Sequence, residues 1–134
     1  MDFTGLNTTI SKEFTFDAAH HLPNHDGKCK NLHGHTYRVV IFARGPIKPL
    51  DGGPEEGMVL DFSKIKGAFK DQIEKRADHK YLNASLPLES TTAENLSWWM
   101  LTELRQDHKE IFKVRVYETP TSYAEAALYE EPAQ

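Results

Sequence analysis

The sequence predicts an α+β domain in which one antiparallel four-stranded sheet carries two helices on one face. Segments near both ends of the chain alternate apolar and polar residues, as half-buried strands do. Two segments between them repeat apolar residues every three or four positions, as amphipathic helices do. The order strand-strand-helix-helix-strand-strand, with hairpin-like joins at each end, favours antiparallel pairing. The 134 residues are enough for one core, so we expect a single domain over 1–134.

The first two strands are predicted from strict alternation. Residues 10–20 place on one face the side chains of Phe14, Phe16, Ala18 and His20. The second strand begins at His35 and runs to about residue 44, and we expect it to be long and central. Residues 45–57 contain three prolines and a Gly-Gly pair, which predicts a surface connection without regular structure.

Helix signals follow this connection. Ser63 is a plausible N-cap for a first helix that ends near Ala77. A second helix is expected to begin after Thr91, which is spaced to form a capping box with Glu94. Residues 112–118 and 122–129 are then predicted as the last two strands, and the acidic tail at 130–132 is expected to fray.

The composition restricts the classes of function. A net charge of −4 argues against a nucleic-acid-binding protein, which normally carries a basic stripe. The one cysteine excludes an intramolecular disulfide and gives no sign of an oxidising compartment. The chain also shows neither a secretory signal nor about 18 consecutive apolar residues, so we expect no membrane partner and a cytoplasmic location.

The motif C-K-N-L-H-G-H at 29–35 predicts a metal site. His33 and His35 lie two positions apart on extended backbone, so their rings share a face. His20 ends the apolar row of the preceding strand, and three neutral imidazoles with one vacant position suit catalytic zinc. His21 is an alternative ligand that alternation directs to the opposite face. His25 lies in the intervening loop and is the next residue to test.

Other residues are candidates for chemistry. A lone cysteine is more often inert than catalytic, but Cys29 is flanked by lysines and close to the predicted dication, which favours thiolate. We therefore predict a base or nucleophile. Asp78 and His79 form an acid–imidazole pair at a helix exit. Glu118 lies on an apolar strand face, where a carboxylate needs a buried cation or a ligand with donor groups, such as a guanidine-like heterocycle edge.

Six ordered stretches carry a resemblance to a known family: F-D-A-A-H-H-L-P, C-K-N-L-H-G-H, G-M-V-L-D-F, A-D-H-K-Y-L-N, T-T-A-E-N-L and Y-E-T-P-T. The chain resembles the 6-pyruvoyl-tetrahydropterin synthase and 6-carboxy-5,6,7,8-tetrahydropterin synthase family. The resemblance implies the tunnelling fold, in which sheets from several subunits close a barrel, and a hexamer built as a dimer of trimers with active sites at subunit interfaces.

The short gap between Cys29 and His33 resembles the carboxytetrahydropterin branch, which belongs to queuosine (7-deazaguanine) biosynthesis. Its members convert 7,8-dihydroneopterin triphosphate to 6-carboxy-5,6,7,8-tetrahydropterin, acetaldehyde and triphosphate. The alternatives are a 6-pyruvoyl-tetrahydropterin product from the same substrate, a zinc-dependent hydrolase of another small molecule, and a non-catalytic, zinc-stabilised oligomeric pterin-binding module.

The resemblance also assigns roles to individual positions. It implies Zn²⁺ as the cofactor and Cys29 as the catalytic thiol. It implies Asp78 and His79 as the acid–imidazole pair and Glu118 as the carboxylate that anchors the pterin. The zinc ligands that it implies are His20, His33 and His35.

Overall fold

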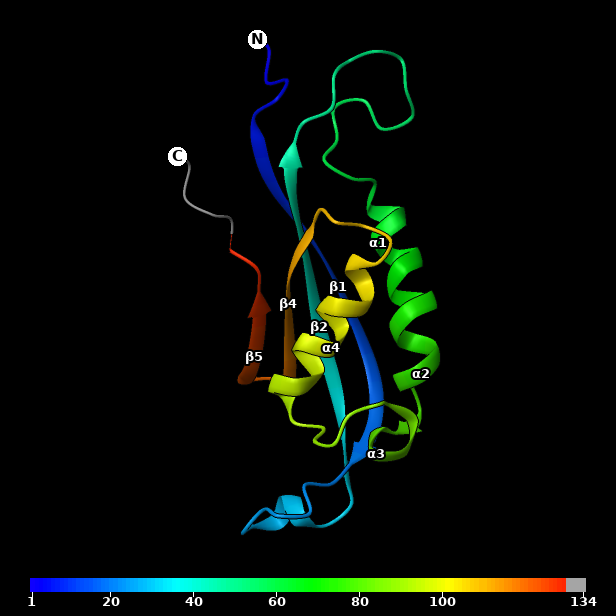
Figure 1. Cartoon of the computed structure of the whole chain (residues 1–134), viewed down its shortest axis with the longest axis vertical. Coiled ribbons are helices and arrows are strands. Elements are labelled where there is room, and N and C mark those ends of the chain that lie inside the picture. The colour runs from blue at the N-terminus through cyan, green and yellow to red at the C-terminus, as the bar shows by residue number, and fades with distance from the viewer. Residues whose placement is uncertain (130–134) are drawn as a thin grey trace.

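The computed structural model describes residues 1–129 of the chain, so the acidic tail predicted at 130–132 lies outside the described residues. The fold is α+β, as predicted, but its sheet has five strands in the order β3-β1-β2-β4-β5. Figure 1 labels the longer strands β1, β2, β4 and β5. The predicted four-stranded, wholly antiparallel sheet is therefore wrong. The extra strand is β3 (Lys80–Tyr81), which pairs parallel to β1. Two residues are too few to show alternation in the sequence.

The four longer strands correspond to the predicted ones. β1 (Asn7–His20) and β2 (His33–Pro46) pair antiparallel along their whole length, with His20 opposite His33. β2 also pairs with β4 (Ile111–Thr119), which pairs with β5 (Ser122–Ala127). β2 is thus central, as predicted, and it begins two residues earlier than the alternation indicated.

The first predicted helix is one continuous segment that changes its hydrogen-bond pattern. It consists of α1 (Phe62–Ala68), the π-helical η2 (Phe69–Glu74) and α2 (Lys75–Ala77). The predicted end at Ala77 is confirmed. The predicted cap is wrong, because Asp61 is the N-cap and its carboxylate accepts from the Ser63 amide at 2.8 Å.

The second predicted helix is α4 (Ala93–Arg105), and its N-cap is Thr92 rather than Thr91. The Thr92 hydroxyl accepts from the Asn95 amide at 3.2 Å. Thr91 is fully buried and bonds elsewhere, so tertiary contact decided between two adjacent threonines. The short helix α3 (Leu82–Ser85) and the 3₁₀ turn η1 (Lys28–Lys30) were not predicted.

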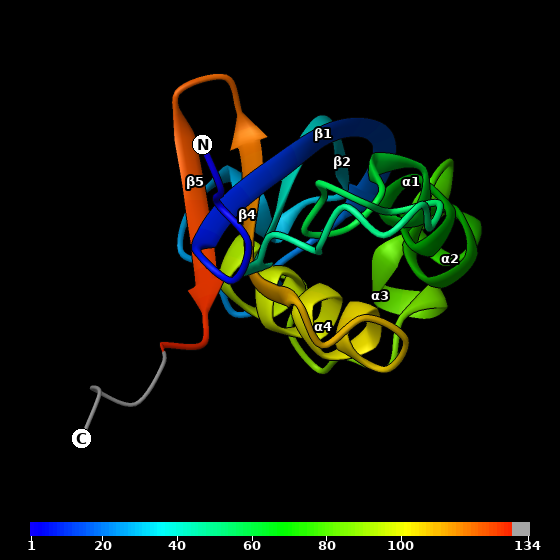
Figure 2. The same ribbon diagram turned by 90° about the horizontal axis from the view of Figure 1, so that it is seen from above.

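The helices cover one face of the sheet, as predicted, and leave the other face open (Figures 1 and 2). The core lies between these layers, where alternate residues of β1, β2 and β4 meet α4 and the α1–α2 segment. Figure 1 shows that β1 and β2 extend past α4 toward the 21–32 connection. None of the helices in the described part of the chain is long and apolar enough to cross a membrane.

Candidate functional site

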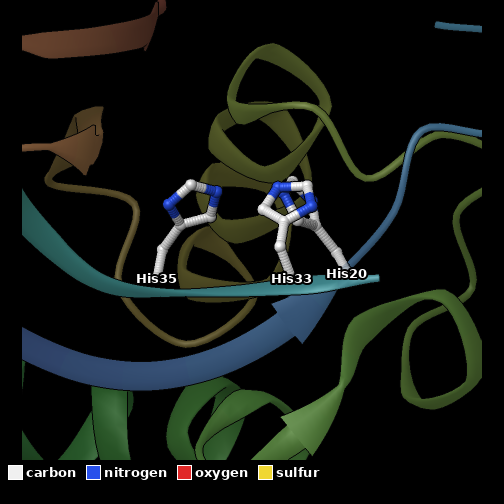
Figure 3. Close-up of side chains that lie close together, drawn as sticks. All are labelled: His20, His33 and His35. Carbon is white, nitrogen blue, oxygen red and sulfur yellow. The ribbon is translucent and has the colours of Figure 1, made fainter. Parts of the chain in front are cut away.

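Three imidazoles converge where the strand pair β1–β2 ends. His20 is the last residue of β1, and His33 and His35 begin β2 on the same face (Figure 3). Ring centroids lie 4.7 Å apart for His20 and His33, 5.1 Å for His20 and His35, and 4.8 Å for His33 and His35. One ligating atom of each lies within 4.8 Å of the others, so this histidine triad has a spacing that one metal ion can bridge.

Backbone contacts orient two of these rings. His20 Nδ1 lies 2.9 Å from the carbonyl oxygen of Thr91, and His33 Nδ1 lies 2.7 Å from that of Asn31. Because a carbonyl only accepts, both Nδ1 atoms carry the proton and donate, which leaves a lone pair on each Nε2. Metal-binding histidines are commonly oriented in this way.

The atoms that would face the metal are buried and unsatisfied. Among the described residues, the Nε2 atoms of His20, His33 and His35 are buried without a hydrogen-bond partner. A buried polar atom left unpaired costs about 1–3 kcal/mol. Three such nitrogen atoms on one side of the sheet therefore indicate a site for a ligand. Three imidazole nitrogens with one open position fit Zn²⁺, although the donor set alone does not fix the metal.

Electrostatics also favours neutral ligands. Burial lowers the pKa of His20 and that of His35, against the opposing attraction of the Glu118 carboxylate. Only the unprotonated imidazole has a lone pair for a metal. The burial that creates the site therefore keeps His20 and His35 unprotonated at neutral pH.

Glu118, near the end of β4, faces the triad. Its carboxylate oxygens lie 3.8 Å from Nε2 of His20 and 3.7 Å from Nε2 of His35. The expectation that this acid meets a cation or awaits a ligand is consistent with this position. Burial and the nearby Glu118 charge also raise the pKa of the Tyr37 hydroxyl, which therefore stays protonated.

Cys29 lies in η1 and lines a cavity of about 600 Å³ together with Glu118. The start of α4 and the first residues of β5 line the same cavity, with Trp98 and Tyr123 among them. The cysteine is free and part-buried. The thiol thus shares a cavity with Glu118, the carboxylate that also faces the triad.

Asp78 and His79 do not reach that cavity within one chain. They follow α2 and lie against β1 beside Asp17, where His79 Nδ1 is 3.0 Å from Asp78 Oδ2. The cavity that His79 lines, of about 650 Å³, shares no lining residue with the cavity of Cys29. The pair and the thiol therefore line different cavities of one subunit, and His35 of the triad lines the cavity of His79.

The structure also shows where the alternative ligands His21 and His25 lie. His21 points away from the triad and packs edge-on against Tyr81 with centroids 5.8 Å apart, as strand alternation predicted. His25 lines the Cys29 cavity and accepts from the Gly27 amide at 2.8 Å. Thr91 was not among the predicted site residues, since only its contact with His20, 71 residues away, shows its part in the site.

Three imidazoles with buried Nε2 atoms face a carboxylate that shares a cavity with a thiol, and this arrangement defines the class as a candidate metal-dependent enzyme. A model of the 6-pyruvoyl tetrahydropterin synthase family matches residues 9–128. The chain belongs to this family and is a pterin-synthase-type enzyme.

Similar proteins agree with this assignment. The chain is 43% identical over 125 residues to a 6-carboxy-5,6,7,8-tetrahydropterin synthase of Synechocystis sp., covering 92% of this chain and 93% of that protein. It is 37% identical to the protein of the same name from Haemophilus influenzae, covering 87% and 96%. The solved structure of Caenorhabditis elegans 6-pyruvoyl tetrahydropterin synthase matches with a TM-score of 0.81 at 26% identity, covering 96% and 100%.

Proposed function

We propose that the protein is a zinc-dependent lyase that converts 7,8-dihydroneopterin triphosphate to 6-carboxy-5,6,7,8-tetrahydropterin, acetaldehyde and triphosphate. The observation that carries the proposal is the set of three unpartnered Nε2 atoms faced by Glu118, which shares a cavity with Cys29. The names of the two bacterial relatives support the carboxy product. The reaction then belongs to queuosine (7-deazaguanine) biosynthesis in the cytoplasm.

We assign each site residue a separate role in the proposed reaction. His20, His33 and His35 hold Zn²⁺, which when bound supplies a Lewis acid for substrate hydroxyls. Glu118 accepts hydrogen bonds from the pterin and fixes the ring, a positioning effect worth several kcal/mol. Cys29 as thiolate takes a proton from the substrate side chain.

His79 shuttles a second proton during elimination and cleavage of the side chain. Asp78 accepts the hydrogen bond at Nδ1, so Nε2 is the atom that takes and returns this proton. Since His79 and Cys29 line different cavities of one chain, the proposal requires a neighbouring subunit to supply the pair. We propose a homo-oligomer, a hexamer formed as a dimer of trimers, with no nucleic-acid or membrane partner.

The product assay tests the reaction. Zinc-loaded protein is incubated with 7,8-dihydroneopterin triphosphate, and mass spectrometry identifies the pterin. We expect 6-carboxy-5,6,7,8-tetrahydropterin with equimolar acetaldehyde. The 6-pyruvoyl product would instead assign the alternative synthase activity, which the family description and the Caenorhabditis elegans structure favour.

Two variants test the thiol and the subunit requirement. Cys29→Ala is expected to abolish turnover while zinc content stays unchanged, and unchanged turnover would discard the role of the thiol. His79→Ala alone is also expected to be inactive. Refolding both variants together should restore part of the activity, because some interfaces then combine an intact thiol with an intact imidazole. Failure of this mixture to recover activity would contradict a site shared between subunits.

The non-catalytic alternative makes an opposite prediction about the metal. A structural zinc site is lost together with the fold. We expect chelation to remove activity while the far-UV circular dichroism of the sheet and helices is largely retained. Loss of that signal on chelation would favour the zinc-stabilised binding module.

A further inference from the structure

The uncovered face of the sheet carries a second hydrogen-bonded group, built around Asp17. Asp17 lies between the buried residues Phe16 and Ala18 of β1, so its side chain leaves the opposite face. Its main chain contacts the acid–imidazole pair at two points. The Asp17 amide donates to Asp78 Oδ1 at 3.1 Å, and the Asp17 carbonyl accepts from the His79 amide at 2.6 Å.

The backbone of His79 shows that these contacts determine the local conformation. His79 has φ of +59°, a left-handed conformation that is uncommon outside glycine and asparagine. The contact with Asp17 stabilises this turn, since it joins the exit of α2 to β3 and holds both against β1. The imidazole itself stays 77% exposed, so the turn presents the ring to solvent or to a neighbouring subunit.

The Asp17 carboxylate makes contacts that its main chain does not. The hydroxyl of Thr36, its cross-strand partner on β2, donates to Asp17 Oδ1. Oxygen atoms of Asp17 and Asp78 and a ring nitrogen of His79 all lie within 4.8 Å of one another. The His79 imidazole therefore faces the carboxylates of Asp78 and Asp17. The sequence motif indicated only Asp78 as its partner.

We propose that Asp17 is a positioning residue for His79: its main chain fixes the Asp78–His79 pair against β1, and its carboxylate, oriented by Thr36, faces the imidazole as a second anion. The catalytic meaning of this arrangement rests on the proposed function, in which His79 carries a proton. Through these contacts the turn that carries the His79 ring is held in one place against β1.

The cavity beside His79 is lined by ionisable groups from three strands. These are Asp17 on β1, His35 on β2, and Lys80 and Tyr81 on β3. Asp17 supplies the carboxylate among these groups, so its side chain is the one to vary.

The test is an NMR measurement at one fixed pH on the zinc-loaded, full-length protein without substrate. Histidine labelled with ¹³C at Cε1 is followed, and His79→Gln assigns the signal. Asp17→Asn removes the charge while keeping the shape and both main-chain contacts, and is expected to move the His79 signal. Thr36→Val leaves the charge but frees its orientation, and should move the signal by less.

Glu13→Gln is the matched control. Glu13 lies on the same strand face as Asp17, four residues and about 13 Å along extended backbone, beyond the screening length of about 8 Å. We expect the His79 signal to keep its position in this variant. A signal that Asp17→Asn leaves unchanged, or that Glu13→Gln moves equally, overturns the proposal.

Turnover separates this proposal from the proposed function. In active enzyme, Asp17→Asn should lower kcat several-fold with little change in KM, and Asp17→Glu should restore part of kcat. Wild-type protein without pterin turnover would refute the proposed function, while the His79 signal would still decide the role of Asp17. An unchanged kcat in Asp17→Asn overturns the positioning role in catalysis.

Discussion

The histidine triad makes a quantitative prediction about metal binding. His20→Ala is compared with His21→Ala, which changes the adjacent residue of the same type. His20 Nε2 is buried in the triad, whereas the His21 ring lies against Tyr81. We expect His20→Ala to lose tightly bound zinc and His21→Ala to retain one zinc ion per chain, as measured by metal analysis after gel filtration.

The magnitude follows from the unsatisfied atoms. Each of the three buried Nε2 atoms costs about 1–3 kcal/mol without a partner, so metal binding relieves at least about 3 kcal/mol. A domain of this size shifts its Tm by about 4 °C for each kcal/mol. Zinc should therefore raise the Tm of the wild-type protein and of His21→Ala by at least about 10 °C.

The comparison can refute the reasoning in two ways. If zinc-loaded and chelated wild-type protein melt at the same temperature, the three nitrogen atoms do not share a metal ion. If His21→Ala loses zinc as readily as His20→Ala, strand alternation did not select the ligand. In His20→Ala we expect zinc to leave the Tm nearly unchanged, because two imidazoles alone bind it weakly.

Three further predictions concern the scaffold. Lys64 and the Asp61 amide hold the pKa of Glu55 at about 2. The stability that this carboxylate contributes is therefore present above about pH 4.5 and lost as pH falls toward 2. Glu55→Gln should flatten acid unfolding in that window, and an unchanged acid limb would contradict the contact. Thr92→Ala removes the α4 cap and should cost about 1 kcal/mol in urea unfolding, whereas Thr102→Ala, inside the same helix, should cost little; equal losses would contradict capping. Ile41→Ala, fully buried on the central strand, should cost about 2–5 kcal/mol by the same assay, and a loss below about 1 kcal/mol would show a loosely packed core.

Local periodicity in the sequence accounts for most of the fold. Alternation in β1 and β2 and the apolar stripes of the two long helices indicated element type and order, because side-chain direction repeats every 2 or 3.6 residues. The same alternation along a strand selected His20 rather than His21 as a ligand and placed His33 and His35 on one face, as the geometry of the triad shows. The family resemblance rested on short motifs, each of which is also local.

Long-range contacts decided what periodicity does not encode. β3 has two residues and exists only because the exit of α2 lies against β1. Thr92 rather than Thr91 caps α4, and the Thr91 hydroxyl instead donates to Asn83 and contacts His20, far away in the chain. Hydrogen bonds of this kind depend on which strands pair, and the pairing is a property of the assembled sheet.

The same distinction governs the site. The sequence by itself determined which residues are available: three imidazoles, a thiol, an acid–imidazole pair and a strand-borne carboxylate. Only the tertiary structure decided that Glu118 faces the triad, that Cys29 shares its cavity, and that His79 lies beside Asp17, whose side chain leaves the other face of the sheet. The physical reason is that the two faces of a sheet have different neighbours. Residues that belong to one set of sequence motifs can therefore lie on opposite faces of the sheet.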